Sequence, residues 1–167
     1  MTGCRFRRCL LLACVVCLMP ARVGAEEGVN FTESQKLTFP TMGLPASGGS
    51  VNLTISPLNS STSGSAQIIS GVASRGQYAL SLSPGGNPVS ISIDITGVTT
   101  GNAGLTLDNF RGFYGSQTID SFPSPTLPLP PRSPASTPLY IGARATANSA
   151  VTPGTYNASF SVTIFIQ

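Results

Sequence analysis

The sequence has 167 residues, no histidine and no tryptophan, and a formal net charge of +3 at pH 7. All four cysteines and four of the nine basic residues lie within residues 1–25. The remaining 142 residues therefore carry five basic and six acidic side chains, no thiol and no imidazole. This part lacks the commonest general base, the commonest metal ligand and the thiolate nucleophile, and its few scattered cations make no nucleic-acid-binding surface. We expect a protein that is not an enzyme, has no cofactor and does not bind nucleic acid.

Residues 1–25 have the organisation of a signal peptide. Three arginines precede an apolar run at residues 9–19, and small residues lead up to Ala25. This run is too short for a transmembrane helix, which needs roughly 20 residues, and the rest of the sequence holds no comparable run. A lipoprotein signal acylated at Cys14 fits less well, because Cys14 stands only six residues after Arg8. We expect cleavage after Ala25, export to the periplasm and then to the cell surface or the exterior, and no transmembrane helix in the mature chain.

Apolar and polar residues alternate with a period of two along the mature sequence, and no segment shows the spacing of a useful helix. The clearest strand is the last, in which one apolar face follows Gly154 and consists of Tyr156, Ala158, Phe160, Val162, Ile164 and Ile166. Similar alternation occurs at residues 51–55, 78–82, 89–95, 105–107 and 139–147. Glycine and proline separate these strands, and residues 97–104 predict a hairpin connection. Short strands at this spacing predict an all-β fold, an antiparallel β-sandwich.

Residues 121–138 contain seven prolines. Proline fixes φ and removes a backbone donor, so this segment cannot form a central strand. One alternative is a proline-rich ligand for a Src-homology-3 groove, but Arg132 stands one residue early for the required spacing. We interpret residues 121–138 as a stiff loop with polyproline character.

Five short motifs carry a resemblance to a known family. They are Leu37-Thr38-Phe39, Gly48-Gly49-Ser50-Val51, Gly76-Gln77-Tyr78, Leu139-Tyr140-Ile141-Gly142-Ala143 and Gly154-Thr155-Tyr156. On these motifs the chain resembles the bacterial domain of unknown function 4402 family, which is similar to spore-coat-U-type and fimbrial subunits. The resemblance covers nearly the whole mature sequence. It departs from the family pattern at Pro40, where family members usually have glycine, and in the proline-rich expansion of residues 121–138.

The resemblance extends in part to chaperone-usher pilins. Gly154 is the fourteenth residue from the end, as in those pilins, but Ile166 stands where an aromatic residue is usual. The likeness implies an immunoglobulin-like sandwich that lacks one strand, which the N-terminal extension of a neighbouring subunit completes by strand addition. Residues 26–35 are the candidate donor strand, with Val29 and Phe31 as its inserting side chains. The alternative for this segment is an ordinary frayed N-terminus.

These expectations divide the sequence into a signal peptide (residues 1–25), an N-terminal extension (residues 26–35) and a β-sandwich domain (residues 36–167). The leading hypothesis is an exported, non-enzymatic structural subunit of a fimbria-like or surface-coat assembly. Its expected partners are homologous subunits, a periplasmic chaperone and an outer-membrane usher. The alternative is a self-contained secreted or surface module for adhesion or ligand binding, with residues 121–138 and the adjoining turns contacting a ligand such as a glycan.

Overall fold

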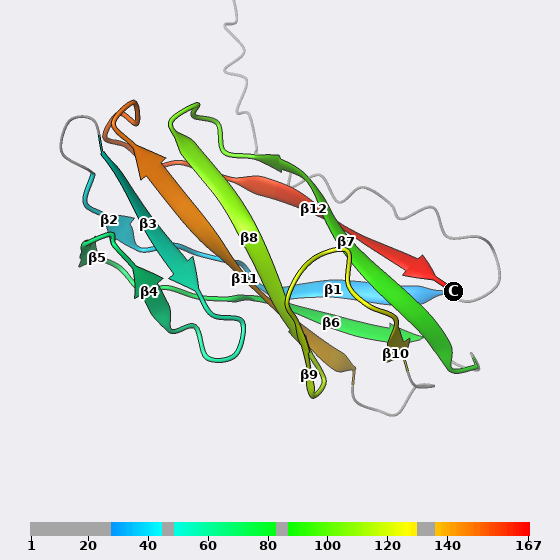
Figure 1. Cartoon of the computed structure of the whole chain (residues 1–167). Helices are drawn as coiled ribbons and strands as arrows, with labels where there is room; N and C mark the ends of the chain where they lie inside the picture. The colour runs from blue at the N-terminus through cyan, green and yellow to red at the C-terminus, as the bar shows by residue number, and fades with distance from the viewer. Residues whose placement is uncertain (1–27, 45–48, 83–86, 130–135) are drawn as a thin grey trace, which may run out of the picture.

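The computed structural model of the chain describes residues 28–44, 49–82, 87–129 and 136–167. Within these ranges the chain forms twelve β-strands and no helix (Figure 1). The strands are β1 (Val29–Gln35), β2 (Thr41–Met42), β3 (Ser50–Ile55), β4 (Thr62–Gly64), β5 (Ile68–Ser70), β6 (Gly76–Leu82), β7 (Val89–Thr99), β8 (Leu105–Tyr114), β9 (Gln117–Ile119), β10 (Leu127–Leu129), β11 (Thr137–Asn148) and β12 (Ser159–Ile166). Their pairing is antiparallel, so the predicted all-β fold is confirmed. The predicted signal peptide and its cleavage site at Ala25 lie outside the described residues.

The larger sheet is built around β11. On one edge of β11, β6 pairs with the first half of the strand and β3 with the second half, so β6 and β3 lie end to end. On the other edge, β8 follows β11 along most of its length. β1, β4 and β9 extend this sheet outward from β6, β3 and β8 respectively. β1 is therefore the outermost strand on its side of the sheet.

Gly142 lies at the point on β11 where β6 gives way to β3. A Cβ atom at this position would overlap the carbonyl oxygen of Ile55 and lie 2.8 Å from the nitrogen of Pro57. The chain that leaves β3 therefore passes over β11 in direct backbone contact, and only glycine leaves room for it. This close approach explains the glycine within an otherwise apolar strand.

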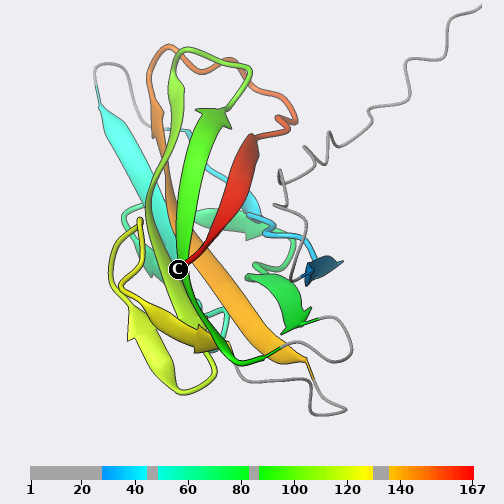
Figure 2. The ribbon, with the colours of Figure 1, turned by 90° about the vertical axis from the view of Figure 1, so that its right-hand side faces the viewer.

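β10, β7 and β12 form a smaller sheet with β7 in the middle. Figure 2 shows β7 and β12 side by side. The apolar faces of the two sheets meet in one core, in a sandwich-like arrangement. Side chains that are fully buried there include Leu80, Ile91, Ile93, Leu139 and Ile141. Within the described ranges, no helix is long and apolar enough to cross a membrane.

β7 and β8 follow each other in the chain but belong to different sheets. The predicted hairpin at residues 97–104 is therefore wrong, because residues 100–104 carry the chain from one sheet to the other. Gly97 itself lies inside β7 with φ of 62°, where the pairing with β12 shifts register. β8 has a matching irregularity at Asn109, whose φ is 48° and which lies where the pairing with β11 shifts register. Bulges of this kind bend a strand and re-aim its side chains.

The last strand is shorter than the alternation predicts. β12 begins at Ser159, so Gly154, Tyr156 and Ala158 precede it. The Tyr156 hydroxyl lies 2.8 Å from the Thr152 hydroxyl, in a loop that continues the alternating pattern without strand pairing. The predicted face in β12 itself therefore consists of Phe160, Val162, Ile164 and Ile166.

The proline-rich segment, residues 121–138, is only partly a loop. Its middle forms β10 at the edge of the smaller sheet, where Leu127 and Leu129 are buried in the core. An edge strand tolerates Pro128 because one of its two backbone edges needs no partner. Pro138 stands near the start of the central strand β11, and its carbonyl oxygen accepts a hydrogen bond from the Gly115 amide at 3.3 Å. The expectation that prolines keep this segment out of a central strand therefore fails at its last two residues, Thr137 and Pro138.

Candidate functional site

The outer edge of β12 is the first candidate site. The Gln167 amide donates a hydrogen bond to the Ser90 carbonyl at 2.8 Å, which fixes which residues of β12 face β7. Because backbone groups in an antiparallel pair alternate between the two edges, the amides and carbonyls of Val162 and Ile164 point away from β7. No strand in the described part of the chain pairs with that edge.

The apolar face of β12 is incompletely covered. Phe160, Val162 and Ile164 pack against the core, yet each is only half-buried. The neighbouring strand β7 contrasts with this, since Ile91 and Ile93 are fully buried. The cause is the position of β12 at the margin of the smaller sheet. The apolar side chains of the predicted last strand therefore remain in partial contact with solvent.

The candidate donor segment forms β1 and pairs with β6 of its own chain. Val29 lies opposite Leu82, and Phe31 lies opposite Leu80. Both β1 side chains are half-buried and pack against the same core as β12. For residues 29–35 the structure thus shows an ordered strand in place of a frayed terminus. The expectation that this strand acts on a neighbouring subunit stays a prediction.

On the side of β7 opposite β12, β10 pairs only with Val89–Ile91, and the free part of this edge beyond β10 is protected by side chains. Asp94 Oδ1 accepts a hydrogen bond from the Ile95 amide at 2.8 Å. The Ser124 hydroxyl accepts one from the Ile93 amide at 2.9 Å, and the Ser124 amide donates to the Ile93 carbonyl at 2.7 Å. These contacts occupy backbone amides and carbonyls that an added strand would need for pairing. The bulge at Gly97 misaligns the backbone groups next to them.

β12 has no comparable protection. Its residues include no charged side chain and no proline, two common means of blocking an edge. Sequence reasoning identified the apolar face of this strand but missed the contrast between the two edges. That contrast depends on Ser124, which lies 31 residues from Ile93 in the sequence.

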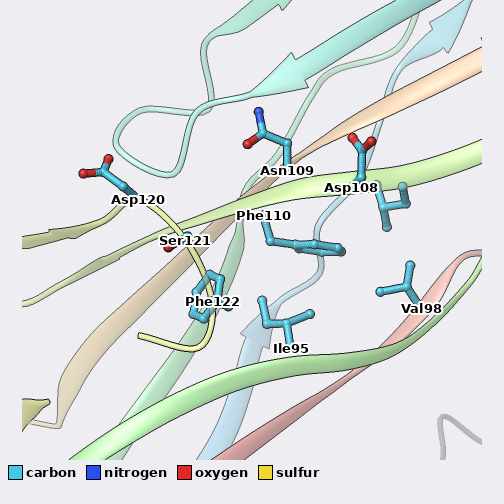
Figure 3. A pocket seen from close by; sticks show the side chains of 9 residues that line it. Ile95, Val98, Asp108, Asn109, Phe110, Asp120, Ser121 and Phe122 are labelled. Atoms are coloured by element: carbon cyan, nitrogen blue, oxygen red, sulfur yellow. The ribbon is translucent and has the colours of Figure 1, made fainter. Parts of the chain in front are cut away.

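A pocket of about 360 Å³ between β7 and β8 is the second candidate site. It is lined by Ile95, Val98, Leu107, Asp108, Asn109, Phe110, Asp120, Ser121 and Phe122. Figure 3 shows the Ile95, Val98, Phe110 and Phe122 side chains around a shared space, whereas Asp108 and Asn109 point away on the other side of β8. The volume is at the lower end of the range for small-molecule sites. Both bulges adjoin this pocket: Asn109 is part of the lining, and Gly97 stands between the lining residues Ile95 and Val98 in the sequence.

The lining of this pocket combines aromatic and aliphatic side chains with two carboxylates, Asp108 and Asp120. Phe110 packs on Phe160 of β12, with ring centroids 5.2 Å apart. Asp108 makes a two-pronged ion pair with Arg144, at 2.9 and 3.0 Å, and these hydrogen bonds raise the pKa of Arg144. Asp120 contributes a carboxylate at the rim. Among the described residues there is no cluster of acidic side chains that could hold a metal ion.

Comparison with known proteins places the chain in a family. The family model described as a domain of unknown function (DUF4402) matches residues 29–165. The chain belongs to this family. The match confirms the assignment made from the short motifs, and it includes both β1 and nearly all of β12. A search of curated proteins and a search of solved structures each found no match.

Proposed function

We propose that this DUF4402 protein is a non-enzymatic structural subunit of a fimbria-like or surface-coat assembly, and that its subunits join by β-strand addition at the outer edge of β12. The observation that carries the proposal is the combination of an unprotected strand edge with a half-buried apolar face on the same strand. An added strand would take the outward backbone groups of Val162 and Ile164. Its alternating apolar side chains would cover the exposed part of the core.

The candidate donor is the segment of residues 26–35 from a neighbouring subunit. Its apolar side chains, Val29 and Phe31, alternate as those of an added strand on the edge of β12 should. In an isolated chain, β1 must first leave β6 and lose the stacking of Phe31 on Tyr78. Such an exchange is slow without help, which supports a periplasmic chaperone and an outer-membrane usher as partners alongside homologous subunits. The leader in residues 1–25 supports export to the periplasm and then to the cell surface.

Substitution of Val162 by proline tests the proposal. The Val162 amide faces the outer edge, so Val162→Pro removes a donor that an added strand needs without removing a hydrogen bond to β7. Val162→Ala is the matched control, because it also trims the side chain but keeps the amide. The full-length wild type and both variants would be expressed in cells that naturally make the protein. Material from the cell surface would then be analysed on denaturing gels with and without heating.

We expect a heat-labile ladder of multimers from the wild type and from Val162→Ala, and only monomer from Val162→Pro. Circular dichroism and urea unfolding of the purified monomers show whether the proline variant is folded. If the proline variant is unfolded, a second measurement uses a synthetic peptide of residues 26–35. When this peptide is added to unassembled wild-type protein, the peptide should block multimer formation. A wild-type protein that is strictly monomeric, or a Val162→Pro variant that forms the full ladder, overturns the proposal.

A second candidate function is ligand binding at the pocket between β7 and β8. It is favoured by the apolar lining from Phe110 and Phe122 at the start of the proline-rich segment. Deleting residues 121–138 is not a fair test, because Leu127 and Leu129 would be removed from the core. The sharper test compares wild type, Phe122→Ala and the control Ser116→Ala, at an exposed position outside the pocket lining, on an array of neutral glycans. Wild-type binding that only Phe122→Ala abolishes supports this function, and an array without binding removes it.

A further inference from the structure

A long antiparallel ladder continues from β1 beyond the sandwich. β1 pairs with β6, then Thr38 and Ser74 exchange backbone hydrogen bonds of 2.9 Å in both directions. β2 and β5 pair next, and the Gly43 amide donates to the Gln67 carbonyl at 2.8 Å. We call residues 38–44 and 67–74 the ribbon. In Figure 1, β2 and β5 lie at the end of the molecule opposite the C-terminus.

The ribbon exposes aliphatic side chains. Leu44 is 42% exposed, Ile68 43%, Ile69 65% and Val72 83%. These four are half of the eight large hydrophobic side chains that are exposed in the described part of the chain. Clustered apolar exposure of this kind marks an interaction surface more often than an isolated exposed side chain does. A two-stranded ribbon is also marginally stable by itself in water, so a covering partner would stabilise it.

The same part of the sequence carries no charge. No acidic or basic residue occurs between Lys36 and Arg75. Surfaces that stay in water are normally rich in charged residues of both signs. A charge-free surface can meet an identical molecule without like-charge repulsion. The ribbon therefore fits an uncharged surface on a protein partner, and a second copy of this chain carries such a surface.

The position of the ribbon in the chain selects that partner. Only residues 36–40 separate β1 from β2. Six residue steps span at most about 20 Å of extended chain. If β1 enters the groove of a neighbouring subunit, β2 must remain within that distance of the neighbour. We propose that the ribbon forms a second contact between adjacent subunits, through Ile69 and Val72, and this inference rests on the strand-addition function proposed above.

Charge introduced on the ribbon tests the inference. Ile69→Lys and Val72→Lys alter side chains that are largely exposed, so the isolated domain is expected to fold normally. Gln117→Lys, at an exposed position on β9, is the matched control. Surface material from cells expressing each precursor would be measured by sedimentation and by unheated denaturing gels. If the ribbon contact contributes as much as an interface hot spot, the amount of multimer should fall about tenfold or more in the two ribbon variants. The amount of multimer should not change in the control.

The outcomes separate this inference from the strand-addition proposal. If Val162→Pro stops assembly but both ribbon variants assemble like wild type, the ribbon contact is wrong and strand addition stands. If wild type itself never assembles, both fail. If the lysine variants do not fold, Ile69→Ser and Val72→Ser remove the same apolar groups without adding charge, and unchanged assembly of these variants also overturns the contact. Monomeric wild type that floats with phosphatidylcholine vesicles, and loses this behaviour in Ile69→Ser, would assign the ribbon to a membrane surface instead.

Discussion

The ring of Phe31 stacks on the ring of Tyr78, with centroids 5.0 Å apart and planes inclined by 10°. Phe31 belongs to β1, the candidate donor strand, and Tyr78 belongs to β6 in the larger sheet. The stacking therefore helps to hold β1 in its own subunit. Any exchange of β1 between subunits must break it first.

Phe31→Ala tests that attachment. Truncating a fully buried phenylalanine to alanine lowers the free energy of unfolding of a protein by about 3–5 kcal/mol. Because Phe31 is half-buried, Phe31→Ala should lower it by about 2–3 kcal/mol. Thr32→Ala, at an exposed position on the same strand, should change stability by less than about 0.5 kcal/mol. Urea unfolding of the mature monomer gives both values. Equal midpoints for Phe31→Ala and wild type would show that β1 does not pack on β6 in solution.

Gly142→Ala should be among the most damaging single substitutions in the domain. The new Cβ atom would overlap the Ile55 carbonyl oxygen, and both partners are backbone, so neither side can yield cheaply. We expect a loss of at least about 3 kcal/mol, or insoluble protein. Gly154→Ala is the control, because its Cβ atom would meet nothing closer than 3.6 Å. A Gly142→Ala domain with a wild-type urea midpoint would contradict the close passage over β11 of the chain that leaves β3.

The strands that sequence alternation predicts best are those with one fully buried face. Tyr78, Leu80 and Leu82 alternate with partly exposed residues along β6, and each is buried. The prediction for residues 139–147 is confirmed in the same way, with Ala143 and Ala145 buried. In these segments the local alternation and the burial in the folded domain agree. The period of two is therefore sufficient to predict the strand and its buried face.

Other features depend on partners far away in the sequence. β9 and β10 are three residues long, which is too short for a periodic signal. The hairpin prediction at residues 97–104 fails because glycine marks both turns and bulges, and only the pairing with β12 distinguishes them. The two candidate sites share this difficulty. Phe110 and Phe122 come together across a turn, and the protection of β7 requires Ser124 from a different segment.

Ser124→Ala should weaken the smaller sheet. Ser124 is a buried polar residue whose hydroxyl bridges the Ile93 amide and the Pro125 carbonyl. Its removal leaves the Ile93 amide without that acceptor, which costs about 1–3 kcal/mol when the amide stays buried. Urea unfolding measures the loss. Ser121→Ala, in the same loop, should have little effect, and equal losses in the two variants would argue against a specific role of the Ser124 hydroxyl.

Ser124→Ala should also expose the free edge of β7 to pairing. Because the Ile93 amide no longer has the hydroxyl as its acceptor, the variant should aggregate faster than wild type at equal fractions of folded protein. Light scattering of the purified domain over several hours measures this. A double variant that also carries Asp94→Ala should aggregate faster still, because the Ile95 amide loses its acceptor too. Aggregation rates that stay at the wild-type level would mean that these side chains do not protect the edge.

Tyr78 should make the domain sensitive to alkaline pH. Burial of its hydroxyl raises the pKa of Tyr78 well above the ordinary value of 10, and the nearby charge of Glu33 raises it further. The unfolded chain therefore releases this proton near pH 10 while the folded chain keeps it. The stability that neutral Tyr78 contributes is complete below pH 10 and falls as the pH rises above it, by up to about 1.4 kcal/mol per pH unit.

Tyr78→Phe should reduce that slope between about pH 10 and pH 11.5 while changing the urea midpoint little at pH 7. Burial also raises the pKa of Tyr114, so part of the slope should remain in the variant. If the free energy of unfolding depended on pH equally in wild type and Tyr78→Phe, the Tyr78 hydroxyl would have to lie in solvent. That result would contradict the described positions of β1 and β6.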